Sequence, residues 1–167
     1  MTDCLKSGSR LVIDTHLLVR AARQEQRDED GPERRLIAGV IGVCARVVFS
    51  PDQARESRPH LRAAGLPPMP QIRLFQRLEE ADKLRNVNAS RMEATAKTLD
   101  ADVLRRLFTG NLDDDPHLYL AAAAHDRIVI TEDAGLLRAR KQIHAKTGVL
   151  TLSLSEALAE QGPSDGD

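Results

Sequence analysis

Short apolar segments rich in β-branched residues alternate along the chain with longer stretches of mixed apolar and charged residues. These segments are Leu11–Ile13, Arg46–Ser50, Arg127–Thr131 and Gly148–Leu152, and Lys83–Val87 is a further candidate with fewer apolar residues. They are too short for helices and are bounded by polar or turn-forming residues, so we predict that they form strands. Strands that alternate with helices imply βαβ crossovers. The sequence therefore predicts an α/β fold with an open parallel sheet flanked by helices on both faces.

Helices are expected between these strands, because the intervening stretches have helical periodicity and are separated by proline-rich breaks such as DEDGP and GLPPMP. The predicted helices are Thr15–Gln26, Glu33–Ala45, Pro51–Ala64, Pro70–Glu80, Ser90–Phe108, Pro116–His125, Ala134–Gln142 and Ser155–Glu160.

The length of 167 residues suits one domain, which we place at residues 10–160, with a flexible N-terminus at 1–9 and a disordered tail at 161–167. No stretch reaches the roughly 18 continuous apolar residues that a membrane span requires. The two cysteines lie far apart, which argues against a disulfide framework or a zinc site and favours the cytoplasm. Aromatic residues make up only 2% of the chain, so a base-stacking platform is not expected.

Acidic residues stand where the strands end, which is where open parallel sheets form their sites. Asp14 follows the first strand and Asp133 follows the fourth. Glu56 lies six residues after Ser50 on the next helix, and Asp115 opens the helix before the fourth strand. We expect these four carboxylates to meet in one cleft.

Carboxylates brought so close repel one another unless a cation compensates them. Oxygen ligands of this kind suit Mg²⁺ or Mn²⁺, and such sites perform phosphoryl chemistry. Each acid also has a structural interpretation: Asp115 and Asp133 are plausible helix N-caps, and Glu56 is a plausible solvated helix residue. Asp14 is the hardest to explain structurally, because it interrupts an apolar run.

Four motifs in order, VIDTH with LLVRA, FSPDQARE, DDDPHLYLAAAA and IVITEDAGLL, resemble those of the PIN-domain nucleases, in particular their bacterial toxin-like branch. The likeness runs from about residue 10 to residue 154. It implies a Rossmann-like parallel sheet with flanking helices. It also implies catalytic, metal-binding acids at Asp14, Glu56, Asp115 and Asp133. Supporting residues around them would be Thr15, His16, Ser50, Thr131 and Asp114.

The sequence departs from the family pattern at a few positions. His16 replaces the usual Asn or Ser after Asp-Thr, and it either perturbs the site or simply opens a helix. Because Asp114 and Asp115 are adjacent, either one could be the ligand and the other a cap. Glu132 adds a carboxylate beside Asp133, and residues 70–110 match the family only weakly.

The resemblance implies an endoribonuclease that depends on Mg²⁺ or Mn²⁺, acting as the toxin of a toxin–antitoxin pair. An antitoxin protein and a second copy of the chain would then be possible partners. Glu56 would orient or deprotonate the attacking water, and the product would carry a 5′-phosphate. The net charge of −1 gives no general attraction for RNA, so local basic residues are the substrate-binding candidates: Arg138, Arg140, Lys141 and Arg55.

Other α/β enzyme classes fit less well. Dehalogenase-type phosphatases need a second aspartate two residues after the first, where this chain has His16. Response-regulator receivers need an aspartate after the third strand and a lysine after the last, and neither is evident. Nucleotide-binding folds need a glycine-rich turn after Ile13, which is also absent. The remaining alternative is a catalytically inactive PIN-like module that binds or scaffolds other molecules.

Overall fold

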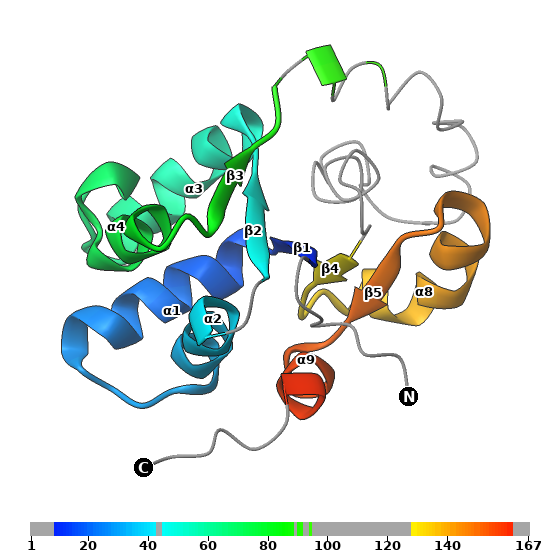
Figure 1. The fold of residues 1–167 in the computed structure, drawn as a ribbon, viewed down its shortest axis with the longest axis horizontal. Coiled ribbons are helices and arrows are strands. Elements are labelled where there is room, and N and C mark those ends of the chain that lie inside the picture. Colours follow the sequence, from blue (N-terminus) through cyan, green and yellow to red (C-terminus); the bar gives the residue numbers. More distant parts are fainter. Residues whose placement is uncertain (1–8, 43–44, 89, 92–93, 95–127, 162–167) are drawn as a thin grey trace.

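The computed structural model describes residues 9–42, 45–88, 90–91, 94 and 128–161 of the chain. Its centre is a five-stranded parallel sheet (Figure 1) with the order β3-β2-β1-β4-β5. The strands are β1 (Arg10–Ile13), β2 (Arg46–Phe49), β3 (Leu84–Asn86), β4 (Ile128–Ile130) and β5 (Leu150–Leu152). Four of them lie within segments that the sequence predicted as strands, and β1 begins one residue before its predicted segment. All of them pair in parallel. The predicted open α/β sheet is confirmed.

The described helices are α1 (Thr15–Arg27), α2 (Pro32–Gly42), α3 (Pro51–Ala63), α4 (Arg73–Glu80), α8 (Ala134–Thr147) and α9 (Leu154–Gln161), with a 3₁₀ turn η1 at Met69–Gln71. Helix α4 begins three residues later than predicted, because the prolines around η1 favour a tight turn. Helix α8 runs five residues further than predicted and ends at Gly148, whose positive φ of 68° suits a helix C-cap. The predicted helices Ser90–Phe108 and Pro116–His125 lie almost entirely outside the described residues.

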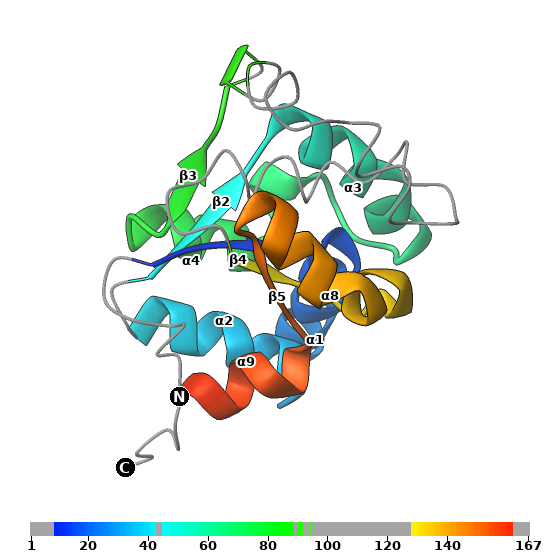
Figure 2. The same cartoon turned by 90° about the vertical axis from the view of Figure 1, so that its right-hand side faces the viewer.

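The order of the strands places the helices in two layers. The chain moves from β1 through β2 to β3 in one direction and from β4 to β5 in the other. Because crossovers are right-handed, α1 to α4 cover one face of the sheet and α8 covers the other (Figures 1 and 2). Helix α9 packs against α2. Among the described residues, no helix is both long and apolar enough to cross a membrane.

Both faces of the sheet are buried, as a parallel sheet between two helical layers requires. Alternate residues such as Leu11, Ile13 and Phe49 belong to the main core with α1, α2 and α4. Val12 of β1 and Val129 of β4 face the other side of the sheet and are also fully buried. The buried residues of the central strands β1, β2 and β4 are therefore all apolar, and polar side chains follow where these strands end. The edge strands β3 and β5 also carry polar residues, such as Asn86 and Thr151.

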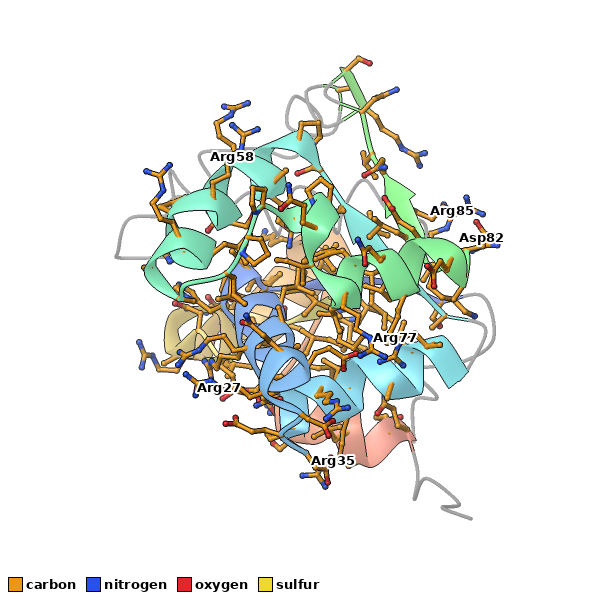
Figure 3. The ribbon with its side chains drawn as sticks, turned by 90° about the vertical axis from the view of Figure 1, so that its left-hand side faces the viewer. Arg27, Arg35, Arg58, Arg77, Asp82 and Arg85 are labelled. Carbon is orange, nitrogen blue, oxygen red and sulfur yellow. The ribbon has the colours of Figure 1, made fainter. Side chains whose placement is uncertain are left out.

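Three helices of the first layer meet at the carboxylate of Glu25, which is only 4% exposed. It accepts hydrogen bonds from Arg34 Nε of α2 (2.9 Å) and from Arg77 Nη1 of α4 (2.8 Å). Arg34 also binds Asp28 (3.0 Å), and this hydrogen bond, assisted by the charge of Glu25, raises the pKa of Arg34. Figure 3 shows Arg77 beside α1 and α2, where it ties α4 to the other helices of this layer.

A second buried carboxylate, Glu33, supports the same junction. It accepts hydrogen bonds from Arg20 Nη1 (3.1 Å) and from Gln24 Nε2 (2.6 Å), both on α1. Helices α1 and α2 are thus held together by polar contacts as well as by apolar packing.

We expect Glu25→Gln to lower the free energy of unfolding by about 1–3 kcal/mol, because it removes a buried charge with which both Arg34 and Arg77 pair and leaves a weaker acceptor. Urea denaturation at pH 7 measures the change. Glu29→Gln is the matched control: Glu29 is about half exposed and pairs with Arg27 only at 3.6 Å. An exposed pair of this kind is worth at most about 1 kcal/mol. Equal effects of the two substitutions would show that the Glu25 junction contributes no special stability.

Candidate functional site

The candidate site starts from a hydrogen bond between the ends of β1 and β4. The register of these strands aligns Ile13 with Ile130, so the residues that follow them are neighbours at the sheet edge. The backbone N–H of Asp14 donates to the carbonyl of Ile130 (2.9 Å). The hydroxyl of Thr131 donates to Asp14 Oδ2 (2.6 Å) and is fully buried.

The second oxygen of Asp14 caps helix α1. Asp14 Oδ1 accepts a hydrogen bond from the backbone N–H of His16 (2.9 Å) at the start of the helix. The side chain is nearly buried, and its charge is stabilised by these two donors and by the positive end of the helix dipole. Because each carboxylate oxygen has two lone pairs, the cap leaves acceptor capacity on both atoms. Capping and ligand binding are therefore compatible roles for Asp14.

Glu56 is brought to the same region by one face of α3. The hydroxyl of Thr15, the first residue of α1, donates to Glu56 Oε2 (2.9 Å). One turn earlier on α3, the fully buried Gln53 donates from Nε2 to the carbonyl of Ile13 (2.6 Å). These two contacts fix α3 against the end of β1, on both sides of Asp14.

Two histidines continue this line of contacts. His60 lies one turn after Glu56 on α3, and its ring meets the ring of His16 at the start of α1. The ring centroids are 4.5 Å apart, and the planes are inclined at 64°. His16, which the sequence marked as a departure from the family pattern, therefore packs edge to face on His60 at the exposed end of the α1–α3 contact.

Asp133 joins the site through Thr131. Its backbone N–H donates to Thr131 Oγ1 (3.0 Å), the hydroxyl that also binds Asp14. Asp133 Oδ1 accepts from the backbone N–H of Leu136 (2.8 Å), so this exposed side chain caps α8. Its predicted capping role is confirmed. Ser50 caps α3 in the same way, accepting from the backbone N–H of Gln53 (3.1 Å).

Threonine hydroxyls thus contact three of the predicted acidic residues. Thr131 links Asp14 with the backbone of Asp133, and Thr15 binds Glu56. Within the part of the chain that the structure describes, no three His, Cys, Asp or Glu residues are grouped closely enough to hold a metal ion. The fourth predicted acid, Asp115, and its neighbour Asp114 lie outside the described residues.

The four predicted substrate-binding residues have different surroundings. Arg138 and Lys141 are exposed on α8, and Arg55 is exposed on α3. Arg140 instead donates twice from Nη1 to the carboxylate of Glu156 (2.7 and 2.9 Å), which ties α8 to α9. Arg140 therefore has a structural partner.

Gln53, His60 and Glu132 contribute contacts that the sequence interpretation did not assign. Glu132 Oε1 accepts a hydrogen bond from the backbone N–H of Leu154 (2.8 Å), so it supports the start of α9. The spacing Ser50–x–x–Gln53 is a capping-box pattern that marks Gln53, although its side chain reaches β1 instead of its own helix. The i, i+4 spacing from Glu56 was the available signal for His60.

No family model matches the chain, and no curated protein matches it in sequence. The likeness to the PIN-domain nucleases therefore rests on the four motifs and on the arrangement of the sheet.

We expect Thr131→Val to lower the free energy of unfolding by about 1–3 kcal/mol, because Asp14 Oδ2 and the N–H of Asp133 both lose a buried partner. The matched control is Thr151→Val in β5. The hydroxyl of Thr151 is buried and, among the described residues, has no hydrogen-bond partner. Its removal should be neutral or stabilising. Chemical denaturation of the two variants tests the comparison, and equal losses would mean that the Thr131 hydroxyl is not a special contact.

Ser153 and Glu156 form a capping box at the start of α9, since each side chain accepts a hydrogen bond from the backbone N–H of the other residue. This capping box should make the stability of the protein depend on pH. The backbone N–H of Ser153 and then the guanidinium of Arg140 lower the pKa of Glu156 below its ordinary 4.5. Its contribution to stability is therefore complete above about pH 4.5, the pKa in the unfolded chain, and is lost as the pH falls through the lower pKa of the folded state. The stability difference between the wild type and Glu156→Gln should shrink between pH 6 and pH 3. A constant difference in urea midpoint across this range would contradict the assignment.

Proposed function

We propose that this chain is a metal-dependent ribonuclease of the PIN-domain type, which hydrolyses phosphodiester bonds in RNA. The observation that supports the proposal is a group of acidic residues that threonine hydroxyls contact at the carboxyl edge of the parallel sheet. There the Thr131 hydroxyl donates to Asp14 and accepts a hydrogen bond from the backbone N–H of Asp133. The Thr15 hydroxyl donates to Glu56. Open parallel sheets form their sites at this edge, and the four motifs occur in the order that the nuclease family has.

The donor set at this edge fits a hard divalent ion, because it consists of carboxylate and hydroxyl oxygens. Asp14, Glu56 and Asp133, with Asp115 or Asp114 from the adjoining motif, would hold Mg²⁺ or Mn²⁺. When bound, such an ion lowers the pKa of water and neutralises charge on the scissile phosphate.

The protein's own residues would position the reaction. Asp14 is held by Thr131 and by the start of α1, so its charge needs little reorganisation when RNA binds. Glu56, oriented by the Thr15 hydroxyl, would take a proton from the attacking water. The water oxygen then bonds to phosphorus, the bond to the 3′-oxygen breaks, and that oxygen takes up a proton. The products are a 5′-phosphate and a 3′-hydroxyl.

Basic residues on two helices would bind the RNA backbone. Arg58 is exposed on α3, and Arg138 and Lys141 are exposed on α8. Figure 3 shows Arg58 projecting outward from α3. Both helices begin at the carboxyl edge of the sheet, so their basic side chains flank the candidate site and can pair with phosphates there.

The resemblance to the toxin-like branch of the family also implies a cellular role. As the toxin of a toxin–antitoxin pair, the protein would act on RNA in the cytoplasm and be held inactive by an antitoxin protein. A homodimer would be a further expected assembly.

We expect Asp14→Asn to reduce RNA cleavage about 100-fold or more, because it removes a charge from the metal-binding set while keeping the cap of α1. The assay is cleavage of a labelled RNA with Mn²⁺ or Mg²⁺, followed by analysis of the product ends. Asp28→Asn, at the other end of α1, is the matched control and should retain activity, because asparagine tolerates the positive φ of 54° there. Unchanged cleavage in Asp14→Asn, or 2′,3′-cyclic phosphate ends, would overturn the proposed mechanism.

A second candidate function is an inactive PIN-like module that binds or scaffolds other molecules. It is favoured by one observation, namely that the described residues contain no group of three possible metal ligands. RNA binding by the wild-type protein without cleavage under either metal would support this alternative.

A further inference from the structure

Two histidines from different helices meet at the outer end of the contact between α1 and α3. His16 lies at the start of α1 and is exposed, and His60 lies on α3 and is partly buried. Their ring centroids are 4.5 Å apart, and the planes are inclined at 64°. An ion in the solvent can therefore reach both rings at once.

The imidazole nitrogens of this pair are ligands of a different kind from the carboxylate oxygens proposed above to hold Mg²⁺ or Mn²⁺. Imidazole suits Zn²⁺, Ni²⁺ and Cu²⁺, whereas Mg²⁺ prefers carboxylate, carbonyl and water oxygens. A neutral imidazole has one nitrogen that accepts, so each histidine can supply one metal ligand. Two histidines that share one ion thus select a transition metal over Mg²⁺.

The separation of the two rings fits the geometry of one shared ion. A metal–nitrogen bond of about 2.1 Å places the centroid of a coordinated imidazole about 3.2 Å from the ion. Two such rings have centroids about 4.5 Å apart when the metal–nitrogen bonds meet at about 90°, and about 5.2 Å apart at the tetrahedral angle. The observed separation of 4.5 Å matches the right angle, which is typical of Ni²⁺ and Cu²⁺ in tetragonal sites. Binding then requires the rings to rotate, while their separation stays the same.

Negative charge lies close to the histidine pair. The backbone N–H of His16 donates to Asp14 Oδ1 (2.9 Å), and Glu56 lies one turn before His60 on α3. Carboxylates at this range attract a cation. The two nearest arginines of α3 are each two residues from His60, so they do not share its face of the helix. The surroundings of the pair therefore favour a bound cation.

We propose that His16 and His60 together bind one transition-metal ion of the Ni²⁺ or Cu²⁺ type, at a site separate from the carboxylate set. The two imidazoles supply two ligands at right angles, and water fills the remaining positions. Because the described residues contain no group of three possible ligands, the affinity is moderate. The ion joins the start of α1, beside Asp14, to the helix that carries Glu56. This inference does not depend on the proposed ribonuclease activity.

The test is isothermal titration calorimetry with NiCl₂ on the full chain without a histidine tag. We expect the wild-type protein to bind Ni²⁺ through the pair. His16→Asn, which restores a residue usual in the PIN-domain pattern, and His60→Gln should each weaken this binding at least about tenfold. Even the loss of a partner outside a ligand set has an effect of about that size. Ni²⁺ should also raise the Tm of the wild type but not of these variants, because the ion holds α1 and α3 together only in the folded state.

His144→Gln is the matched control, because it removes an exposed histidine from another helix, α8, and it should bind Ni²⁺ like the wild type. Thermal unfolding without metal checks that each variant is folded. Asp14→Asn separates the two sites: it should keep Ni²⁺ binding while it disables the carboxylate set. A loss of tenfold or more in Asp14→Asn would place the ion on the carboxylates and overturn the histidine site. So would an absence of Ni²⁺ binding by the wild type, or unchanged binding in either His16→Asn or His60→Gln. RNA cleavage enters none of these outcomes, so the ribonuclease proposal stands or fails separately.

Discussion

The hydrogen bond from Thr131 to Asp14 is the contact on which the geometry of the candidate site depends, since it joins residues 117 positions apart. It exists because β1 and β4 pair in parallel with a fixed register, which places the two side chains at neighbouring strand ends. A shift of one residue in either strand would turn every side chain of that strand to the opposite face and separate the pair. The close packing of the buried valines and isoleucines opposes this shift, because side chains of a shifted strand would no longer fit their neighbours. Apolar packing in the sheet therefore determines the position of a charged group at its edge.

The strands could be predicted because their physical signal is local. β-Branched runs such as Val47–Phe49 and Ile128–Ile130 are too short for helices and too apolar for loops. The ends of helices were less predictable, because they depend on single backbone choices. Gly148 was expected to begin the last strand, but its positive φ makes it the C-cap of α8, so that strand starts two residues later at Leu150. Helix α4 is likewise delayed by a 3₁₀ turn that periodicity alone does not reveal.

Part of the site could be predicted for a similar reason. Asp14, Ser50 and Thr131 follow strands directly, so the topology alone brings them to one edge. Contacts between helices are different, because they depend on how α1 and α3 cross, which no pattern in either helix specifies. Spacing along α3 can therefore mark Gln53 and His60, but it cannot identify their partners, Ile13 and His16. Charge patterns have the same limit: Arg140 resembles a phosphate-binding residue in sequence, but its partner is Glu156 on another helix.

Helix α3 is the element that relates these observations to one another. Ser50 caps its first turn, and Gln53 in that turn binds the carbonyl of Ile13, the residue before Asp14. The same turn also begins one wall of an apolar cavity of about 670 Å³ between α3, η1 and α4, since Ser50 and Ala54 line it. A displacement of α3 that widened or narrowed the cavity would therefore also move Glu56 relative to Asp14. Gln53 resists such a displacement, because it is fully buried and is hydrogen-bonded both to Ser50 before α3 and to Ile13 at the end of β1. The hydrogen bond from Gln53 to the carbonyl of Ile13 thus constrains both the position of Glu56 and the shape of the cavity.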